Sequence, residues 1–453
     1  MTDREPTLPG AAQAALVAAL LVTAGSGVGG SLTLIVGIPF TCAGFAVAWV
    51  AARRARREPA ARSFAVIYFL LSANAAIALS AGPPYDAPRW YEAAYRIHPA
   101  CGIILVGLVA SGRPRVRRIA AWTAVAGATA LLLATPIAMP RPMIDVWALT
   151  QASVQALLHG VHPYTVTAPD VSGGRYDFGY ATIVYPYMPL TLLVNAPAVA
   201  LLGDYRFTLA LCFPITIVLL RAAGRRLAVD GHTSDVVTLA LALQPRLAFV
   251  VAAGWHEPLL VAAAAMFVYL AARNPDGIGA ATAFMLLPAL KQYVAAPVLI
   301  FVALRPRWRS IAAGALVAAA TVVPFLIWNP RATITGVLAI PTQMLAASAF
   351  RTDSTSLTAV LARASGVRAG PWLGAMAQLV AGGAAWAMLR GNSRRSPSGT
   401  GDHAPGDLLL ASALSLLASF LLGTQAFVNY YAFAAALLLC AALVYARRDE
   451  AVR

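Results

Sequence analysis

One carboxylate is placed for acid–base chemistry: Asp145 begins the segment DVWALTQASVQALLHG. Apolar residues recur at helical spacing from Val146 to Leu158, and Gly160 predicts the end of that helix. An aspartate at a helix start can cap the helix by accepting hydrogen bonds from free backbone N–H groups. It can also act as a general base on a hydroxyl that reaches it. The local pattern leaves both roles open.

Two cations lie in apolar surroundings and are candidates for binding an anion. Lys291 is the only lysine among the 34 Lys and Arg residues and falls between two short apolar runs. An ionisable side chain at membrane depth is a functional hypothesis by default, because an ammonium there can hold a phosphate. Snorkelling to the interface is the plainer alternative. Arg246 lies within another apolar run, where it could hold a phosphate or pair with a carboxylate or carbonyl.

A His–Glu pair follows a tryptophan in the segment Trp255-His256-Glu257-Pro258. Such a pair could bind a polar substrate beside the indole ring. A metal site is a weak interpretation, because His256 has no second ligand at helical spacing. The alternative is a plain helix start with Pro258 in its first turn.

Aromatic residues gather in the same stretches of the chain. Aromatic faces stack on sugar rings, and tyrosine hydroxyls hydrogen-bond to sugar hydroxyls. The alternative is a belt of aromatic side chains at a membrane interface. The candidates for binding a sugar or an acceptor are Trp147, His162, Tyr164, Tyr180, Tyr185, Trp255, His256, Glu257 and Arg351.

Composition decides what kind of protein carries these residues. Of 453 residues, 60% are hydrophobic and only 11% are charged, whereas soluble domains are about 25% charged. A set of soluble domains and a disordered chain are both excluded, which leaves a polytopic membrane protein. The net charge of +16 is interpreted as arginines that orient helices, not as a nucleic-acid surface. The four cysteines fall in apolar runs, which argues against disulfides and a metal site.

Apolar runs long enough to cross a bilayer predict an all-α transmembrane bundle of about 14 spans. Strand-like alternation of about ten residues, the mark of a membrane barrel, is absent from the sequence. The pair 277–290 and 292–304 is short and is either two spans or one broken element. The expected spans are about 11–29, 32–52, 63–82, 98–112, 119–139, 206–222, 234–253, 257–272, 277–290, 292–304, 309–327, 370–389, 407–423 and 427–446.

The distribution of arginines predicts the orientation of these spans. Most Lys and Arg residues fall in alternate loops, which the positive-inside rule assigns to the cytoplasm together with both termini. Two long segments, about 140–205 and 328–369, are then external and carry short helices. The run 189–203 is expected to be one of these helices. Residues 391–406 are interpreted as a flexible cytoplasmic linker and 447–453 as a cytoplasmic tail.

An ordered set of motifs resembles the GT-C superfamily of membrane glycosyltransferases. The chain is similar to glycosyltransferase family 87 and to the polyprenol-phosphate-mannose-dependent mannosyltransferases of actinobacteria. The resemblance covers about 118–446, expected to be the catalytic membrane domain. It rests on D-V-W…L-L-H-G-V-H-P-Y (145–164), Y-P-Y-M-P-L (185–190), G-D-Y-R (203–206), W-H-E-P-L-L (255–260) and A-L-K-Q-Y-V-A-A-P (289–297).

The resemblance implies an activity and roles for the residues. Asp145 matches the acidic residue of the first external loop, the general base, and Lys291, Gln292 and Arg246 would face the donor phosphate. The donor would be a polyprenyl-phosphate sugar, mannose first among sugars. A glycolipid, glycan or protein would supply the acceptor hydroxyl, with inversion at the anomeric carbon and no metal or cofactor. The enzyme would work at the external face of a bacterial plasma membrane.

The chain departs from the simplest pattern of that superfamily, because four spans precede the one that leads to Asp145. The role of residues 1–117 is therefore open, and Asp86 and Glu92 in an earlier external loop are alternative bases. A transporter or flippase for a lipid-linked or polar solute is the first rival function. A non-catalytic subunit of a cell-envelope assembly is the second. No internal repeat is evident in the sequence, and the polar candidates cluster at one face, which favours the enzyme.

Overall fold

The computed structural model of the chain is helical throughout the part that it describes. The described residues are 8–28, 36–54, 64–167, 184–303, 308–347, 354–367, 369–370, 372–395, 404–424 and 426–447. Within these ranges the only strand-like pairing is a single antiparallel bridge between Thr167 and Val184. The all-α class predicted from the sequence is confirmed for these residues.

Seven of the helices are long and apolar enough to cross a membrane. They are α1 (Gly10–Gly27), α4 (Arg89–Ala110), α5 (Pro114–Ala138), α8 (Arg206–Arg226), α14 (Trp308–Trp328), α19 (Ala404–Leu422) and α20 (Val428–Tyr445).

Shorter apolar helices and one further long helix complete the bundle. The shorter ones are α2 (Ile38–Arg54), α3 (Ala65–Ser80), α7 (Pro189–Leu202), α11 (Glu257–Ala271), α12 (Ile278–Leu290) and α13 (Ala295–Ala303), and the further long helix is α18 (Leu373–Arg395).

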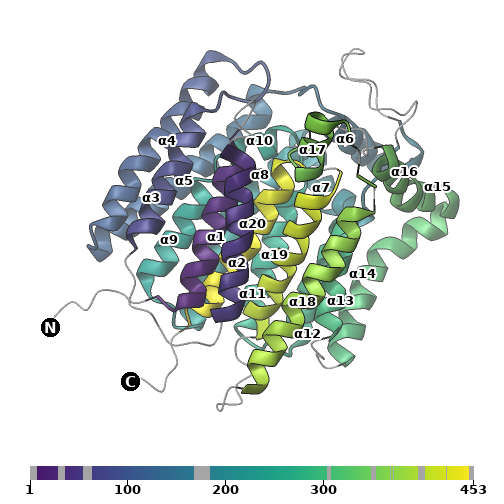
Figure 1. The fold of residues 1–453 in the computed structure, drawn as a ribbon. Helices are drawn as coiled ribbons and strands as arrows, with labels where there is room; N and C mark the ends of the chain where they lie inside the picture. The colour runs from purple at the N-terminus through teal and green to yellow at the C-terminus, as the bar shows by residue number, and fades with distance from the viewer. Residues whose placement is uncertain are drawn as a thin grey trace.

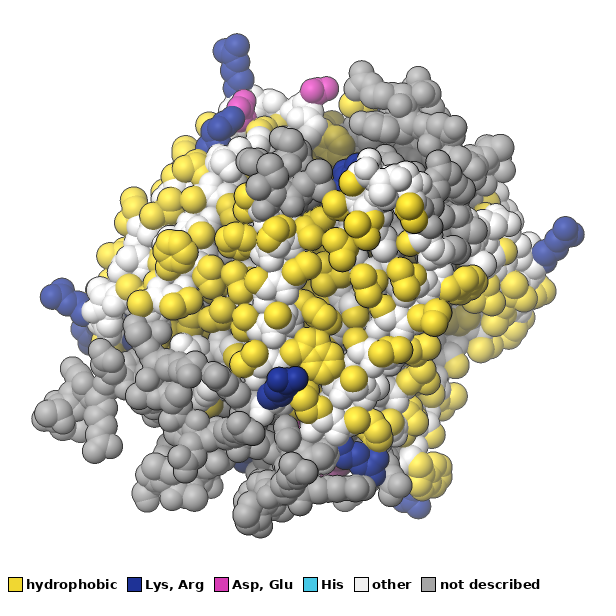
Figure 2. Space-filling view, viewed as in Figure 1, with side chains coloured by type: hydrophobic (Ala, Val, Ile, Leu, Met, Phe, Trp, Pro, Cys, Tyr) yellow, Lys and Arg dark blue, Asp and Glu magenta, His cyan; other side chains and the backbone are white. Residues whose placement is uncertain are grey.

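The bundle has a buried centre and an apolar outside. Helix α20 lies in the middle of the bundle (Figure 1), and 89% of its most apolar 18 residues are buried. For α14, on the outside, the same share is 17%. Large apolar side chains stand exposed on the outer helices, among them Ile104, Leu316 and Val380. Figure 2 shows apolar side chains across the middle of one face, with arginines mostly near its rim. So broad an exposed apolar surface is what a lipid environment requires.

The N-terminal helices belong to this same bundle. Helix α1 packs along α2 and α20, and the Asn74 amide of α3 donates to the Leu20 carbonyl of α1 at 3.1 Å. Residues 8–28 therefore form part of the buried centre.

A buried acid fixes one end of the α5–α8 pair. Asp235 belongs to α9 (Gly231–Ala242). Its carboxylate accepts from Arg117 Nε of α5 and from an Arg221 nitrogen of α8, each at 2.7 Å. The two guanidinium groups compensate the carboxylate, whose side chain is only 2% exposed.

The expected span 234–253 is wrong as a continuous helix. Helix α9 ends at Ala242, and α10 (Leu247–Ala252) begins after a break. Pro245 explains the break, because proline has no N–H to donate and its ring clashes with the preceding turn. Arg246 thus lies at the start of α10, and its Nε donates to the Gly27 carbonyl at 3.0 Å.

The short pair at 277–304 separates at Lys291. Helix α12 ends at Leu290, a 3₁₀ turn covers Gln292–Val294, and α13 follows. Helix α12 packs on α11 and α14, whereas α13 packs on α18 and α19. The two helices therefore have different neighbours, and the chain between them presents Lys291 in an extended conformation.

Two expected segments, the span 98–112 and the linker 391–406, have other bounds in the structure. Helix α4 begins at Arg89, nine residues before the predicted span 98–112, and the i,i+4 ion pair of Glu92 and Arg96 supports this extension. The flexible linker expected at 391–406 is wrong at both ends, since α18 runs to Arg395 and α19 begins at Ala404. Single glycines and serines only modestly lower the propensity of an established helix. Residues 396–403 lie outside the described part.

Both segments expected outside the membrane carry short helices, gathered at one end of the bundle (Figure 1). They are α6 (Asp145–Leu158), a 3₁₀ turn (Pro163–Thr165), α7, α15 (Pro330–Ile334), a π-helical turn (Thr335–Ala339), α16 (Ile340–Ala347) and α17 (Leu357–Ser365).

The turn between α10 and α11 depends on a glycine. Gly254 has φ +69°, its carbonyl accepts from the Tyr205 hydroxyl at 2.8 Å, and a Cβ added there would collide with that hydroxyl. A left-handed backbone costs other residues about 1–2 kcal/mol, so two separate effects require glycine here.

We expect Gly254→Ala to lower the free energy of unfolding by more than this backbone cost, because the collision with Tyr205 adds to it. Gly160→Ala is the matched control: Gly160 has φ +73°, but nothing lies within 4 Å of its added Cβ. Unfolding in detergent, followed by circular dichroism, measures both losses. Equal losses would show that the Tyr205 contact does not hold the turn.

Candidate functional site

A buried ion pair joins two helix ends. Lys291 Nζ, just after α12, lies 2.5 Å from Glu257 Oε1, the first residue of α11, and their side chains are 5% and 1% exposed. The Tyr293 hydroxyl donates to the same carboxylate oxygen at 3.2 Å. Removing one partner of such a pair typically costs about 3–5 kcal/mol, because the other charge stays buried. The two candidates that the sequence placed in separate motifs therefore form one unit.

Three tyrosine rings surround the ammonium group. Lys291 Nζ lies 5.3 Å from the ring centres of Tyr187 and Tyr293 and 5.1 Å from that of Tyr430. Cations at this distance from an aromatic face are attracted to its negative centre. The sequence reasoning missed Tyr430 as a site residue; its only signal was an aromatic pair at the start of the last apolar run.

The loop that carries Tyr187 is held by its backbone. Gln292 Nε2 donates to the Pro186 carbonyl at 2.6 Å and to the Val337 carbonyl at 3.2 Å. The Tyr164 hydroxyl donates to the Tyr187 carbonyl at 2.7 Å. Both amide hydrogens of Gln292 are thus directed to the protein, so this side chain positions the loop.

Asp145 acts electrostatically on a member of this cluster. It is the first residue of α6, its carboxylate accepts from the Val146 N–H at 2.8 Å, and Ile144 occupies the cap position without a side-chain bond. Burial raises the pKa of Tyr187 well above 10.0, and the charges of Tyr430, Asp145 and Glu257 raise it further. Asp145 is therefore within electrostatic reach of the ring that contacts Lys291.

His256 lies in the same cluster and is neutral. Its ring is fully buried, meets the Tyr187 ring edge-on at 4.9 Å, and its Nε2 is 3.3 Å from the Thr150 hydroxyl of α6. Burial lowers the pKa of His256 well below 6.5, and the Lys291 ammonium lowers it further. Its Nδ1 has no hydrogen-bond partner among the residues that the structure describes.

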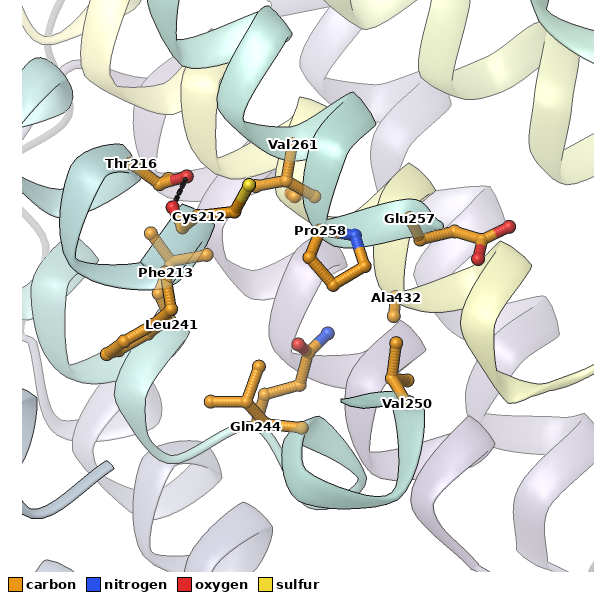
Figure 3. Close-up of a pocket in the computed structure, with 12 residues that line it drawn as sticks. Cys212, Phe213, Thr216, Leu241, Gln244, Val250, Glu257, Pro258, Val261 and Ala432 are labelled. Atoms are coloured by element: carbon orange, nitrogen blue, oxygen red, sulfur yellow. Dashed lines mark hydrogen bonds between the residues drawn. The ribbon is translucent and has the colours of Figure 1, made fainter. Parts of the chain in front are cut away.

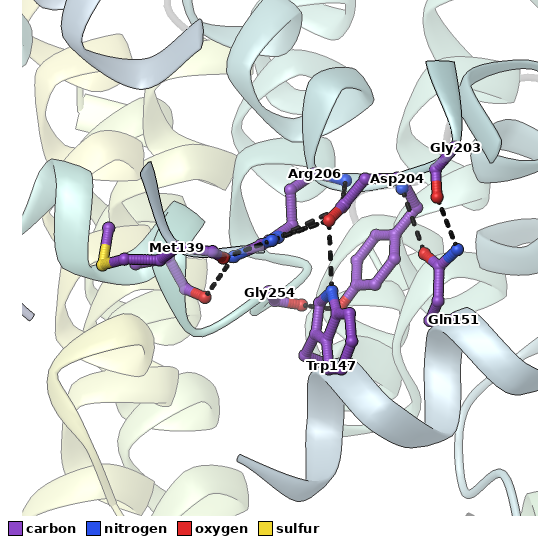
Figure 4. A network of polar contacts seen from close by, with 9 residues as sticks. Met139, Trp147, Gln151, Gly203, Asp204, Arg206 and Gly254 are labelled. Carbon is purple, nitrogen blue, oxygen red and sulfur yellow. Dashed lines mark hydrogen bonds and ion pairs between the residues drawn. The ribbon is translucent and has the colours of Figure 1, made fainter. Parts of the chain in front are cut away.

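A second buried network fixes α6 against the rest of the bundle (Figure 4). The Asp204 carboxylate accepts from an Arg206 nitrogen at 2.6 Å and from Trp147 Nε1 at 3.3 Å. Arg206 is fully buried and also donates to the carbonyls of Met139 at 2.8 Å and Ala252 at 3.2 Å. The Arg206 guanidinium therefore joins the ends of α5 and α10 to the start of α8. Its partner Asp204 accepts a hydrogen bond from Trp147 of α6.

Gln151 adds a second attachment for α6. Its amide donates to the Gly203 carbonyl at 2.8 Å, and its oxygen accepts from the Tyr205 N–H at 3.3 Å. Asp145 thus stands on a helix attached at two successive turns. The motif at 203–206 contributes to the family resemblance, but the sequence alone indicated no role for Asp204 or Arg206.

Other candidates are placed away from the ion pair. Arg246 contacts Gly27 and the Phe249 ring. His162 packs against the end of α14: its Nε2 is 3.3 Å from the Phe325 carbonyl oxygen, and its ring contacts the Trp328 ring. Trp255 contacts Phe249 and stacks on Phe427.

The remaining candidates are Tyr185, the alternative bases and two residues that the structure does not describe. Tyr185 is buried between the rings of Tyr164 and Tyr187. Glu92 pairs with Arg96 on the surface, and Asp86 is exposed. Tyr180 and Arg351 lie outside the described residues.

An apolar pocket lies beside the first turn of α11 (Figure 3). It holds about 460 Å³ of empty volume, open solvent included, between α8, α11, α20 and the α9–α10 break. In Figure 3 the Glu257 carboxylate points away from Thr216 and Leu241 on the opposite wall. The carboxylate therefore faces the tyrosine cluster, not the apolar pocket.

Fold and site together define a helical protein with membrane-type helices and a buried, charged cluster near one end. No family model matches the sequence, and neither a curated protein nor a solved structure matches it.

Burial of neutral His256 predicts a pH dependence of stability. Its pKa is lowered in the folded state, so the unfolded chain binds the proton more readily, and stability falls as the pH drops through 6.5. The loss approaches about 1.4 kcal/mol per pH unit below that value. We expect His256→Gln to flatten the dependence of the unfolding temperature on pH between pH 8 and pH 5.

Exposed His159 provides the control for this measurement. The slope for His159→Gln should match that of the wild type. An unchanged slope for His256→Gln would contradict the buried neutral state of His256.

Proposed function

We propose that this protein is an integral membrane glycosyltransferase of the GT-C type. It transfers a sugar, mannose on the resemblance of its motifs, from a polyprenyl-phosphate donor to an acceptor hydroxyl. The observation that carries the proposal is the shared position of Tyr187. Its ring contacts the Lys291 ammonium, and its phenol is within reach of the Asp145 charge. A cation suited to a phosphate thus contacts a side chain that lies within electrostatic range of the proposed base.

The proposed reaction assigns a separate task to each charged group. Asp145 takes the proton of the acceptor hydroxyl, whose oxygen attacks the anomeric carbon. The bond from that carbon to the lipid phosphate breaks, and the phosphate leaves with the bonding electrons toward the Lys291 ammonium. Inversion converts a β-linked donor into an α-linked product. Gln292 serves by holding the loop of Tyr187, since its amide hydrogens bond to backbone carbonyls.

The lengths of the helices beside the site support a lipid-borne donor. Helix α12 has 13 residues, which rise about 20 Å, whereas the hydrocarbon core of a bilayer is about 30 Å thick. With α12 starting at the cytoplasmic boundary, Lys291 lies within the depth of the membrane. A phosphate attached to a polyprenyl chain reaches that depth from the side.

The proposed topology follows the arginine pattern. About 14 spans cross a bacterial plasma membrane, both termini are cytoplasmic, and the site opens to the external face. The short helices α6, α7, α15, α16 and α17 then form the external cover of the site.

A transporter of a lipid-linked or polar solute is the second candidate. The interruptions between α9 and α10 and between α12 and α13 favour it, because transporters bind substrates at broken helices. Flux of a solute across vesicles, without release of lipid phosphate from any lipid-phosphate sugar, would decide for the transporter.

Asp145→Asn should abolish transfer while leaving the donor bound. The loss expected for a general base is about 10²- to 10⁴-fold in rate, because the amide cannot accept the proton. Purified protein with polyprenyl-phosphate mannose and candidate acceptors measures it as release of lipid phosphate.

Asp86→Asn and Glu92→Gln are the matched controls, since both acids belong to the earlier segment expected outside the membrane and neither is buried. Both variants should keep the wild-type rate. Full activity in Asp145→Asn, or its loss in Glu92→Gln, would contradict the assignment of the base.

A further inference from the structure

Two buried polar atoms at the ion pair lack a partner among the described residues. They are the second carboxylate oxygen of Glu257 and Nδ1 of the preceding residue, His256. Both side chains are at most 1% exposed. A buried polar atom without a partner costs about 1–3 kcal/mol, and native proteins leave few of them. Their gathering beside one charged pair indicates a polar ligand.

The type of these atoms restricts the chemistry of the ligand. An ionised carboxylate only accepts hydrogen bonds, whereas a hydroxyl both donates and accepts. A phosphate ester anion offers only acceptors, so it suits Lys291 but not the second oxygen of Glu257. That oxygen requires a donor, and in a sugar phosphate the donor is a hydroxyl.

The short distance within the pair joins these two requirements in one ligand. Lys291 Nζ and Glu257 Oε1 are 2.5 Å apart, so one small ligand can reach both the ammonium and the second oxygen of the same carboxylate. In a sugar phosphate the hydroxyl nearest the phosphate stands on the carbon next to the esterified one. Neutral His256 directly precedes Glu257, and its Nδ1, which has no partner among the described residues, can bond to a further ring hydroxyl.

We propose that the Lys291–Glu257 pair recognises a sugar 1-phosphate ester by its phosphate together with the hydroxyl on the adjacent carbon. Lys291 holds the phosphate, and the second carboxylate oxygen of Glu257 accepts the hydrogen of the 2-hydroxyl group. This inference rests on the proposed function and explains how the site would select among sugars. Glu257 is then a substrate-binding residue as well as the counterion of Lys291.

The test compares binding of a short-chain prenyl phosphate mannose with that of its 2-deoxy analogue to the full-length protein in detergent. Wild type should bind the analogue about 10- to 100-fold more weakly, because the free oxygen of Glu257 stays unpaired. Glu257→Gln should reduce this difference to about twofold, since a neutral amide accepts more weakly than a carboxylate. Equal binding of both ligands by wild type would overturn the inference and leave the glycosyltransferase proposal standing.

Two further variants keep the test decisive. Glu257→Asp retains the counterion of Lys291 but withdraws the carboxylate by one methylene. This variant should fold and lose most of the discrimination between the mannose ligand and its 2-deoxy analogue. Full discrimination by Glu257→Asp would overturn the inference. Asp407→Asn removes another buried acid, which bonds to Tyr445, and should discriminate as wild type does. Binding of neither ligand by wild type would overturn both the inference and the proposed function.

Discussion

The buried pair of Lys291 and Glu257 is the constraint around which the rest of the site is arranged. A lone ammonium could not remain at 4% exposure among apolar helices, so the start of α11 must bring a carboxylate to the end of α12. The three tyrosines follow from the same need, because their faces stabilise a cation that water cannot reach. They come from the loop before α7, the turn after α12 and the start of α20, so one charge orders three distant segments.

A second set of buried charges makes this corner rigid. Arg206 and Asp204 hold the start of α8, and Asp235 holds its other end through Arg221 while also binding Arg117 of α5. Helix α8 is therefore fixed at both ends, and α6 is attached to it through Trp147 and Gln151. The proposed role of Asp145 as a general base requires a carboxylate held within hydrogen-bond reach of its substrate, and these contacts fix the helix that carries Asp145.

Composition and periodicity predicted the all-helical class and the helix beginning at Asp145, because both depend on local preferences. The break at Pro245 escaped prediction, since hydrophobicity continues across it while proline removes a backbone donor. The sequence singled out Lys291, Glu257 and His256 separately, but a contact between residues 34 positions apart leaves no local signal. For the same reason the backbone role of Gln292 and the burial of Arg206 could not be deduced from their neighbours in the chain.

The central claim is that a polyprenyl-phosphate sugar binds between Asp145 and Lys291. The most direct measurement is a structure of the protein in lipid nanodiscs with a non-hydrolysable polyprenyl-phosphonate analogue of the mannose donor. We predict that a phosphonate oxygen lies within hydrogen-bond distance of Lys291 Nζ and that the anomeric carbon faces the Asp145 carboxylate. An analogue bound elsewhere, with the Lys291 cluster unchanged, would contradict the account.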